Sequence, residues 1–262
     1  MPALEQYLSR PMAPPAAAAL AAVEGGPIDP ADALPESQIG RLLDPAPLPA
    51  ECGYCWLPDG VGYVAMRTAA TGVTAAMVEW WFEWHPVEDV RYRVWHPRAH
   101  VSNRADPPAR PGEKPYWGST HHPVEDIGTG VEHLRIEFVP PWELGFARDA
   151  LERPGVMCIV GGFAGDDKRR VRHTRMVHVF LEDPATGATV QRSRFWIGSS
   201  LRPYAPAIAA APVAALINRP LVRNRMIPRR TPQTLARHCA EEFAQLAAIL
   251  PGLYAEYGPG VA

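Results

Sequence analysis

Four cysteines, a net charge of −2 and no long apolar run limit what this 262-residue chain can be. The cysteines are too sparse for a disulfide scaffold. Cys52 and Cys55 have CxxC spacing, but there is no second such pair and no histidine at zinc-finger spacing. We therefore interpret all four as ordinary buried or loop thiols: Cys52, Cys55, Cys158 and Cys239. A charge near zero gives no electrostatic case for nucleic acid or an anionic membrane, and neither partner is expected.

The sequence also lacks a transmembrane pattern. Its Ala-rich segment at 15–23 has only nine residues, which is too short to cross a bilayer. No signal peptide fits the start, because Glu5 interrupts it and no apolar run follows. A cytoplasmic protein is therefore the expectation.

Hydrophobic residues make up 47% of the chain. This is enough for one large domain with a small appendage. Residues 1–50 are predicted to form an N-terminal arm with short helices at 16–23 and 36–43, because Gly-Pro and Asp-Pro runs interrupt them. Residues 51–262 are predicted to form the main domain.

Beyond residue 51 the hydrophobic pattern alternates repeatedly, as in strands. Thirty prolines predict many interrupted elements. Short connections favour antiparallel pairing, so the predicted class is α+β, with a sheet that encloses a cavity against a long C-terminal helix. Strands are predicted at 53–66, 90–95, 131–139, 155–163, 171–182 and 189–197, and helices at 72–84, 206–217 and from 231 onward.

The C-terminal helix carries the most informative pattern. Thr231 is predicted as its N-cap and Pro232 as its first helical residue. One face, predicted to point inward, has three- and four-residue steps: Leu235, His238, Glu242, Leu246 and Ile249. The predicted solvent face contains Arg237, Glu241 and Gln245.

His238 and Glu242 thus lie one turn apart on an apolar stripe. An ionised carboxylate there costs several kcal/mol unless it is paired or binds a cation. His-x-x-x-Glu is a convergent ligand pair for a metal such as zinc, although the same spacing also occurs in surface ion pairs.

A catalytic zinc needs further ligands. His100, with Asn103 three residues later, and Glu125, next to two histidines, are candidates. Local spacing does not choose among the histidine-bearing stretches, which contain His85, His96, His100, His121, His122, His173 and His178.

Four ordered blocks carry a resemblance to a known family. They are YRVWHPRAHVSN at 92–103, THHPVEDIG at 120–128, RSRFWIG at 192–198 and the His238-x-x-x-Glu242 pair. Together they resemble the 2,4-diacetylphloroglucinol hydrolase and phloretin hydrolase family, and the likeness extends from about residue 53 to residue 248.

The resemblance implies a helix-grip, Bet v1-like fold with zinc bound by two histidines and two glutamates. Glu132 replaces Glu125 if the preceding loop is aligned differently. Tyr92 and Asn103 match residues that hold the phenolic oxygens of the substrate, and His178 matches a proton-transferring histidine. The implied zinc ligands are His100, Glu125, His238 and Glu242.

The implied activity is hydrolysis of the carbon–carbon bond between an acyl group and a polyhydroxylated aromatic ring. One departure is Phe195, which falls where the family has a second phenol-binding tyrosine, so a non-aromatic β-diketone is an alternative substrate to a phenolic ketone. A non-catalytic carrier of a hydrophobic ligand is the rival from another class, although a carrier has no need of a buried carboxylate. A homodimer is one assembly open to the chain.

Overall fold

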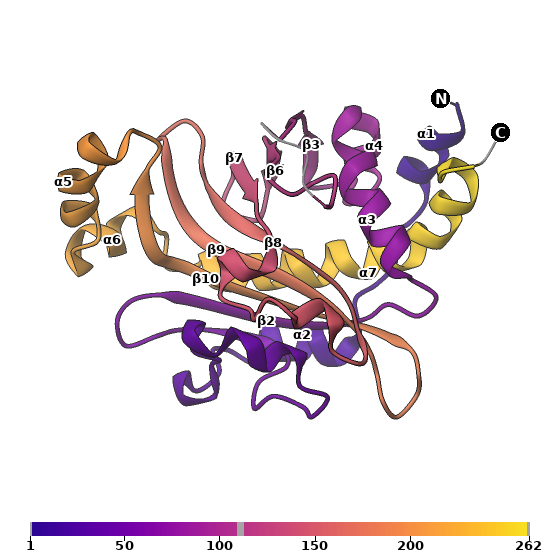
Figure 1. Ribbon diagram of the computed structural model, residues 1–262, viewed down its shortest axis with the longest axis horizontal. Coiled ribbons are helices and arrows are strands. Elements are labelled where there is room, and N and C mark those ends of the chain that lie inside the picture. The colour runs from indigo at the N-terminus through magenta and orange to yellow at the C-terminus, as the bar shows by residue number, and fades with distance from the viewer. Residues whose placement is uncertain (1, 109–112, 261–262) are drawn as a thin grey trace.

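An antiparallel sheet forms the middle layer of this computed structural model, which describes residues 2–108 and 113–260 (Figure 1). The main strand order is β1-β2-β10-β9-β8-β7-β5-β4, and β6 pairs with both β3 and β7. Every strand pairing is antiparallel, so the predicted α+β class is confirmed. The strands are β1 (Gly53–Trp56), β2 (Gly62–Ala69), β3 (His100–Ser102), β4 (Ala105–Asp106), β5 (Thr120–His121), β6 (Val124–Asp126), β7 (Val131–Phe138), β8 (Val156–Asp166), β9 (Val171–Glu182) and β10 (Thr189–Pro203).

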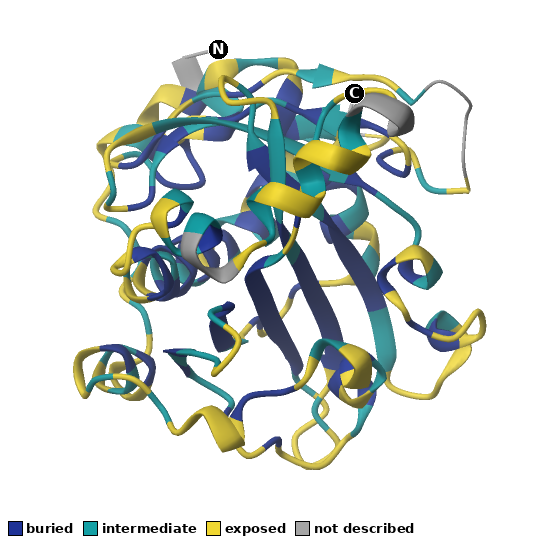
Figure 2. Ribbon diagram, turned by 90° about the vertical axis from the view of Figure 1, so that its left-hand side faces the viewer, coloured by how far each residue is buried: buried dark blue, intermediate teal, exposed yellow. Residues whose placement is uncertain are grey.

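The long central strands are buried along much of their length because both sheet faces are covered (Figure 2). On β9, Met176 and Phe180 pack on the side of the C-terminal helix, and Val177 and Val179 pack on the opposite side. Strands buried on both faces lose the alternation of a half-exposed strand and become almost continuously apolar.

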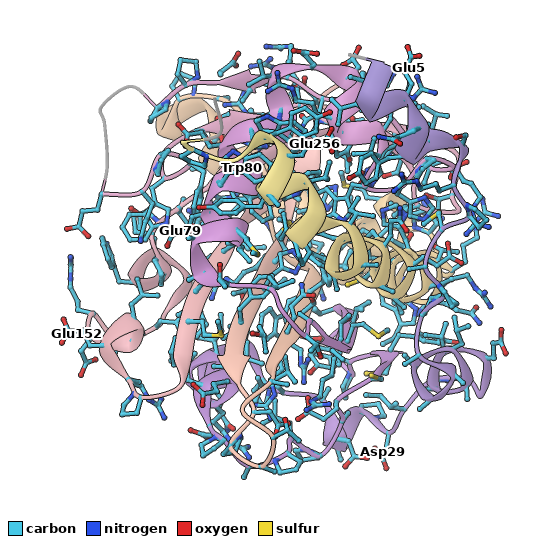
Figure 3. All side chains as sticks on the ribbon, turned by 90° about the vertical axis from the view of Figure 1, so that its right-hand side faces the viewer. Glu5, Asp29, Glu79, Trp80, Glu152 and Glu256 are labelled. Carbon is cyan, nitrogen blue, oxygen red and sulfur yellow. The ribbon has the colours of Figure 1, made fainter. Side chains whose placement is uncertain are left out.

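Helix α7 (Thr231–Tyr257) covers the first face and packs on β1 and β2. Its buried side chains include Phe243 and Leu246. Figure 3 shows Trp80 beside the C-terminal turns of α7, where its ring packs edge-on against Tyr254 with centroids 5.3 Å apart. The remaining α-helices are α1 (Pro2–Ser9), α2 (Ala17–Glu24), α3 (Ala75–Trp84), α4 (Asp89–Arg93), α5 (Ala207–Ile217) and α6 (Pro220–Met226).

Residues 28–48 of the N-terminal segment cover the second face of the sheet, whereas α1 and α2 pack on the side of α7. Two 3₁₀ helices of this segment, η1 (Pro30–Asp32) and η2 (Glu36–Leu43), lie in the layer on the second face, with Ile39 and Leu42 packed in the cluster of Val177, Val179 and Trp196. The predicted helix at 36–43 is therefore a 3₁₀ helix. The other 3₁₀ helices are η3 (His85–Val87), η4 (Pro141–Leu144) and η5 (Ala150–Glu152). The division into an arm and a catalytic domain stays a prediction.

The predicted strand at 90–95 is wrong. These residues form α4 and its C-terminal turn, in which the Tyr92 amide donates to the Glu88 carbonyl and the Val94 amide donates to the Val90 carbonyl. Tyr92 and Val94 are both buried, which imitates strand alternation. A helix of five residues is too short to display a 3.6-residue period.

Two predictions about α7 are also wrong. Arg230 is the N-cap and Thr231 is already helical, so the Thr231 hydroxyl makes no capping bond. Gln245 is buried rather than facing solvent. Its side chain accepts from the Ala13 amide at 2.8 Å and donates to the Val94 carbonyl at 3.4 Å, because the N-terminal segment covers this side of the helix.

The predictions for the last strand and for the cysteines are confirmed. The strand predicted at 189–197 continues past an irregularity to Pro203. All four cysteines are free, three of them buried. Among the described residues, no helix has both the length and the apolar character that a membrane span requires.

Arg192 attaches the N-terminal layer to β10, so we predict that Arg192→Ala lowers the free energy of unfolding by about 3 kcal/mol. The side chain is 4% exposed and donates to the carbonyls of Leu42, Asp44 and Ala46 and to the Glu51 carboxylate. Urea denaturation measures the change. Arg153→Ala, which breaks a solvent-exposed pair with Asp44, is the control, with an expected loss under about 0.5 kcal/mol. Equal effects of the two substitutions would contradict the prediction.

Candidate functional site

A cavity of about 120 Å³ lies between the sheet and α7. Strands β7, β9 and β10 supply one wall through alternate side chains, and α7 supplies the other through residues one turn apart. The lining is mainly apolar and aromatic with a few convergent polar groups, as is usual for ligand sites. Those polar groups include Tyr92, Asn103, His121, Glu125, Glu132, His173, His178, Thr231, His238 and Glu242.

Three of the predicted residues form a buried cluster in which the ligand atoms of His100, His238 and Glu242 all lie within 4.8 Å of one another. His238 and Glu242 come from successive turns of α7, with Nε2 and Oε2 3.6 Å apart. His100 opens β3, and its Nε2 lies 3.7 Å from the same carboxylate oxygen. The inward orientation predicted from helical spacing is therefore confirmed.

Glu125 joins this cluster through strand pairing. It is opposite His100 in the β3–β6 ladder, and its Oε2 lies 3.5 Å from His100 Nε2. The Tyr92 hydroxyl donates to the same Glu125 oxygen. Glu132 is opposite Glu125 in the β6–β7 ladder and accepts from the Thr129 hydroxyl, so it has a different partner.

The orientation of His100 is fixed on two sides. Its Nδ1 lies 3.1 Å from the Tyr92 carbonyl, so Nδ1 carries the proton and donates. Its ring stacks on the Tyr92 ring with centroids 4.0 Å apart and an angle of 3°. Nε2 is then the nitrogen with a free lone pair, which is the arrangement typical of metal-binding histidines.

Burial determines the charge preferences of the cluster. It raises the pKa of Glu125 to about 7 and raises the pKa of Glu242 well above its ordinary value. It lowers the pKa of His238 to about 3 and also lowers that of His100. Low polarity disfavours every charged form, so the four side chains provide no positive charge of their own to balance the carboxylates.

A divalent cation fits this donor set. The Nε2 atoms of His100 and His238 are buried without a hydrogen-bond partner among the described residues. Unpartnered imidazole nitrogens beside carboxylates suit zinc, which takes nitrogen and oxygen ligands. A bound cation would also favour the ionised carboxylates and the neutral imidazoles.

The other predicted residues, Tyr92, Asn103, His178 and Phe195, also line the cavity. Asn103 Oδ1 is buried and lacks a hydrogen-bond partner in the described part of the chain. His178 Nδ1 lies 2.8 Å from Ser193 Oγ, which leaves its Nε2 to face a ligand. Burial lowers the pKa of His178 to about 3, so this imidazole is neutral at neutral pH.

Sequence spacing did not single out two further cavity residues, His85 and His121. Their rings lie 5.4 Å apart beside the aromatic end that includes Phe138. His121 Nδ1 is buried and has no hydrogen-bond partner within the described ranges. The only sequence signal was the His121-His122 pair, of which His122 binds Asp106 and Asp167 instead of lining the cavity.

Comparison with known proteins identifies related sequences. The DAPG hydrolase PhiG domain profile matches residues 34–255, a span that includes the whole cluster. The chain is 31% identical to the phloretin hydrolase of Eubacterium ramulus over 262 residues, with 96% of this chain and 89% of that protein covered. It is 34% identical over 249 residues to the 2,4-diacetylphloroglucinol hydrolases of a Pseudomonas species, with 90% and 82% covered, and of Pseudomonas protegens, with 90% and 78% covered.

The buried histidine at position 85 generates a prediction about acid stability. Its Nδ1 lies 2.7 Å from the Trp81 carbonyl, and burial lowers its pKa to about 3. Protons therefore bind the unfolded chain more readily, and stability present above pH ~6.5 is lost as pH falls toward ~3, by up to about 1.4 kcal/mol per pH unit.

We expect that in His85→Phe the free energy of unfolding falls less steeply as the pH decreases from about 6 to about 4. At pH 7 the variant should lose only about 1 kcal/mol of this free energy, because one hydrogen bond is missing. Urea unfolding at each pH, on metal-depleted wild type and variant alike, measures both effects. Parallel stability curves for the two proteins would contradict the assignment.

Proposed function

The chain belongs to the DAPG hydrolase PhiG domain family, and on this premise we propose that it hydrolyses the carbon–carbon bond between an acyl group and a polyhydroxylated aromatic ring. The substrate is a phenolic ketone of the acylphloroglucinol type. Support comes from the names of the relatives, which are hydrolases of phloretin and 2,4-diacetylphloroglucinol. The observation that carries the proposal is the His100–His238–Glu242 cluster inside a cavity lined mainly by apolar and aromatic side chains.

We infer that His100, Glu125, His238 and Glu242 hold a divalent cation, with zinc as the expected ion. The cation would polarise the acyl carbonyl and lower the pKa of water, as zinc does in other hydrolases. The Tyr92 hydroxyl and the Tyr92 carbonyl orient Glu125 and His100 respectively, so one residue positions two of these side chains. Such supporting contacts commonly contribute 10- to 100-fold to metal affinity.

The aromatic end of the cavity is proposed to hold the ring. Asn103 offers an unpartnered Oδ1 to a phenolic hydroxyl, and the Tyr92 hydroxyl lies beside Glu125 at the same end. Phe195 adds apolar surface but no hydroxyl. One substrate oxygen then loses a partner, and this observation favours a second candidate, hydrolysis of a non-aromatic β-diketone.

His178 is proposed to move the proton. In its neutral form it can accept a proton from the attacking water, which converts it to an imidazolium acid. Such an acid is suited to protonate the ring carbon as the carbon–carbon bond breaks. The carboxylic acid and the deacylated phenol are the two products.

We also infer that the sheet and α7 form the helix-grip, Bet v1-like arrangement. The long helix packed on β1 and β2, with a cavity between helix and sheet, supports this fold. Many proteins with a cavity of this kind could carry a hydrophobic ligand without catalysis. Two buried carboxylates serve no purpose in such a carrier, so we favour the enzyme.

The carboxylate assignment predicts that Glu125→Gln lowers zinc affinity by at least the ~10- to 100-fold that loss of a supporting contact alone causes, whereas Glu132→Gln leaves one zinc per chain. The two residues are cross-strand neighbours, so the pair of variants is matched for location. Competition with a chelator, read by elemental analysis of the purified protein, measures affinity and stoichiometry. Zinc loss in Glu132→Gln alone would assign the ligand to Glu132.

The proton-transfer assignment predicts that His178→Ala lowers kcat on an acylphloroglucinol by about 10²- to 10⁴-fold with little change in zinc content. His122→Ala is the control, because His122 lies outside the cavity and pairs with two aspartates. Release of carboxylic acid in a coupled titration follows turnover. Full turnover in His178→Ala would remove this residue from the mechanism.

A further inference from the structure

A second cavity, of about 310 Å³, adjoins the first at the N-terminal end of α7. Four residues line both cavities, Glu132 from β7, His173 from β9, Ile197 from β10 and Thr231 from α7. These four side chains, called the neck below, border both spaces. The second cavity is the larger of the two, so a ligand that fills the first has room to extend beyond the neck.

One part of the wall of the second cavity is apolar, and polar side chains that include Glu132, His133 and Asp166 form the rest. Val131 and Val171 begin their strands in the apolar part, and Leu201, Met226 and Ile227 complete it. Lys168 and Arg169 are exposed at the β8–β9 turn, where the cavity meets solvent. An apolar chain would be desolvated by this surface, and each buried methylene strengthens binding roughly fourfold.

The neck also holds a buried hydroxyl group. Thr231 Oγ1 is buried without a hydrogen-bond partner among the described residues, and the residue is 8% exposed. Its hydroxyl is available to a ligand atom that passes between the two cavities. Such unpaired buried groups are uncommon in folded proteins and often mark a position that a ligand or water completes.

We propose that the second cavity binds the acyl arm of the substrate, and that the chain prefers acyl groups much longer than acetyl. The inference rests on the proposed function, which places the acyl carbonyl at the His100–His238–Glu242 cluster and the ring at the aromatic end beside Tyr92.

Distances along α7 set the length of the arm. Thr231 precedes His238 by seven residues, or about 10 Å along the helix at a rise of ~1.5 Å per residue. An acetyl methyl extends only about 1.5 Å beyond the carbonyl carbon and stays within the first cavity. An extended alkyl chain advances about 1.25 Å per carbon, so a decanoyl group extends about 11 Å and a dodecanoyl group about 14 Å, long enough to pass the neck and enter the second cavity.

The test compares acetyl-, decanoyl- and dodecanoyl-phloroglucinol as substrates of the zinc-loaded full chain. Val131→Trp places a bulky ring in the second cavity, and Val87→Trp is a matched control because both valines are exposed, 61% and 66% respectively, while Val87 lines neither cavity. We expect wild type to favour the long arms in kcat/KM, and Val131→Trp to reduce the ratio of long-arm to acetyl kcat/KM at least tenfold. Val87→Trp should keep the wild-type ratio.

An unchanged ratio in Val131→Trp would overturn the proposal, and an equal slowing of all three substrates would show a common entrance instead of an arm site. Calorimetric binding of the same three compounds separates this inference from the proposed function. Tighter binding of the long arms, lost in Val131→Trp, supports the arm site even if no compound is cleaved. Binding that is independent of arm length would overturn the arm site even if all compounds are cleaved.

Discussion

The burial of two carboxylates beside two imidazoles is the constraint on which the site depends. Glu125 and Glu242 are almost removed from water, and neither faces an arginine or a lysine in the cavity. An uncompensated buried carboxylate costs several kcal/mol, and His100 and His238, neutral because of the same burial, cannot offset it. The fold tolerates this arrangement because rigid elements hold it. Two turns of one helix and one antiparallel ladder position the four side chains, and Tyr92 supports two of them through its hydroxyl and its carbonyl.

The layers around the sheet explain which elements were predictable from sequence. The strands β7, β8 and β9 and the helices α3 and α7 are long enough to display their periods, and the structure contains them close to the predicted bounds. The elements that were predicted wrongly are short, and the residue that was predicted wrongly is buried by a segment far away in the sequence. Five-residue α4 resembles a strand, and Gln245 has a polar side chain whose burial depends on the Ala13 amide, far away in sequence. Such contacts between distant segments leave no local pattern.

The residues of the candidate site also differ in how far local sequence indicates them. Helical spacing alone brings His238 and Glu242 together, because four residues make one turn. His100 and Glu125 meet only through the β3–β6 ladder, in strands of three residues each, so no local period indicates their pairing. The resemblance of ordered motifs supplied those two residues. It did not identify His121, whose unpartnered nitrogen becomes meaningful only when the cavity around it is known.

Chemistry and specificity therefore depend on different parts of this fold. The cluster is fixed by backbone pairing and helical pitch, which side-chain substitutions on the walls do not alter. The neck and the second cavity are built instead from strand ends, a hairpin turn and the α6–α7 connection. Loops and strand ends tolerate changes in length and sequence better than a paired ladder does. Phe195 is such a wall position, because its side chain lines the cavity while its backbone stays in the β2–β10 and β9–β10 ladders. A change of substrate can thus be accommodated at Phe195 or at the second cavity without disturbing the four side chains that would hold the cation.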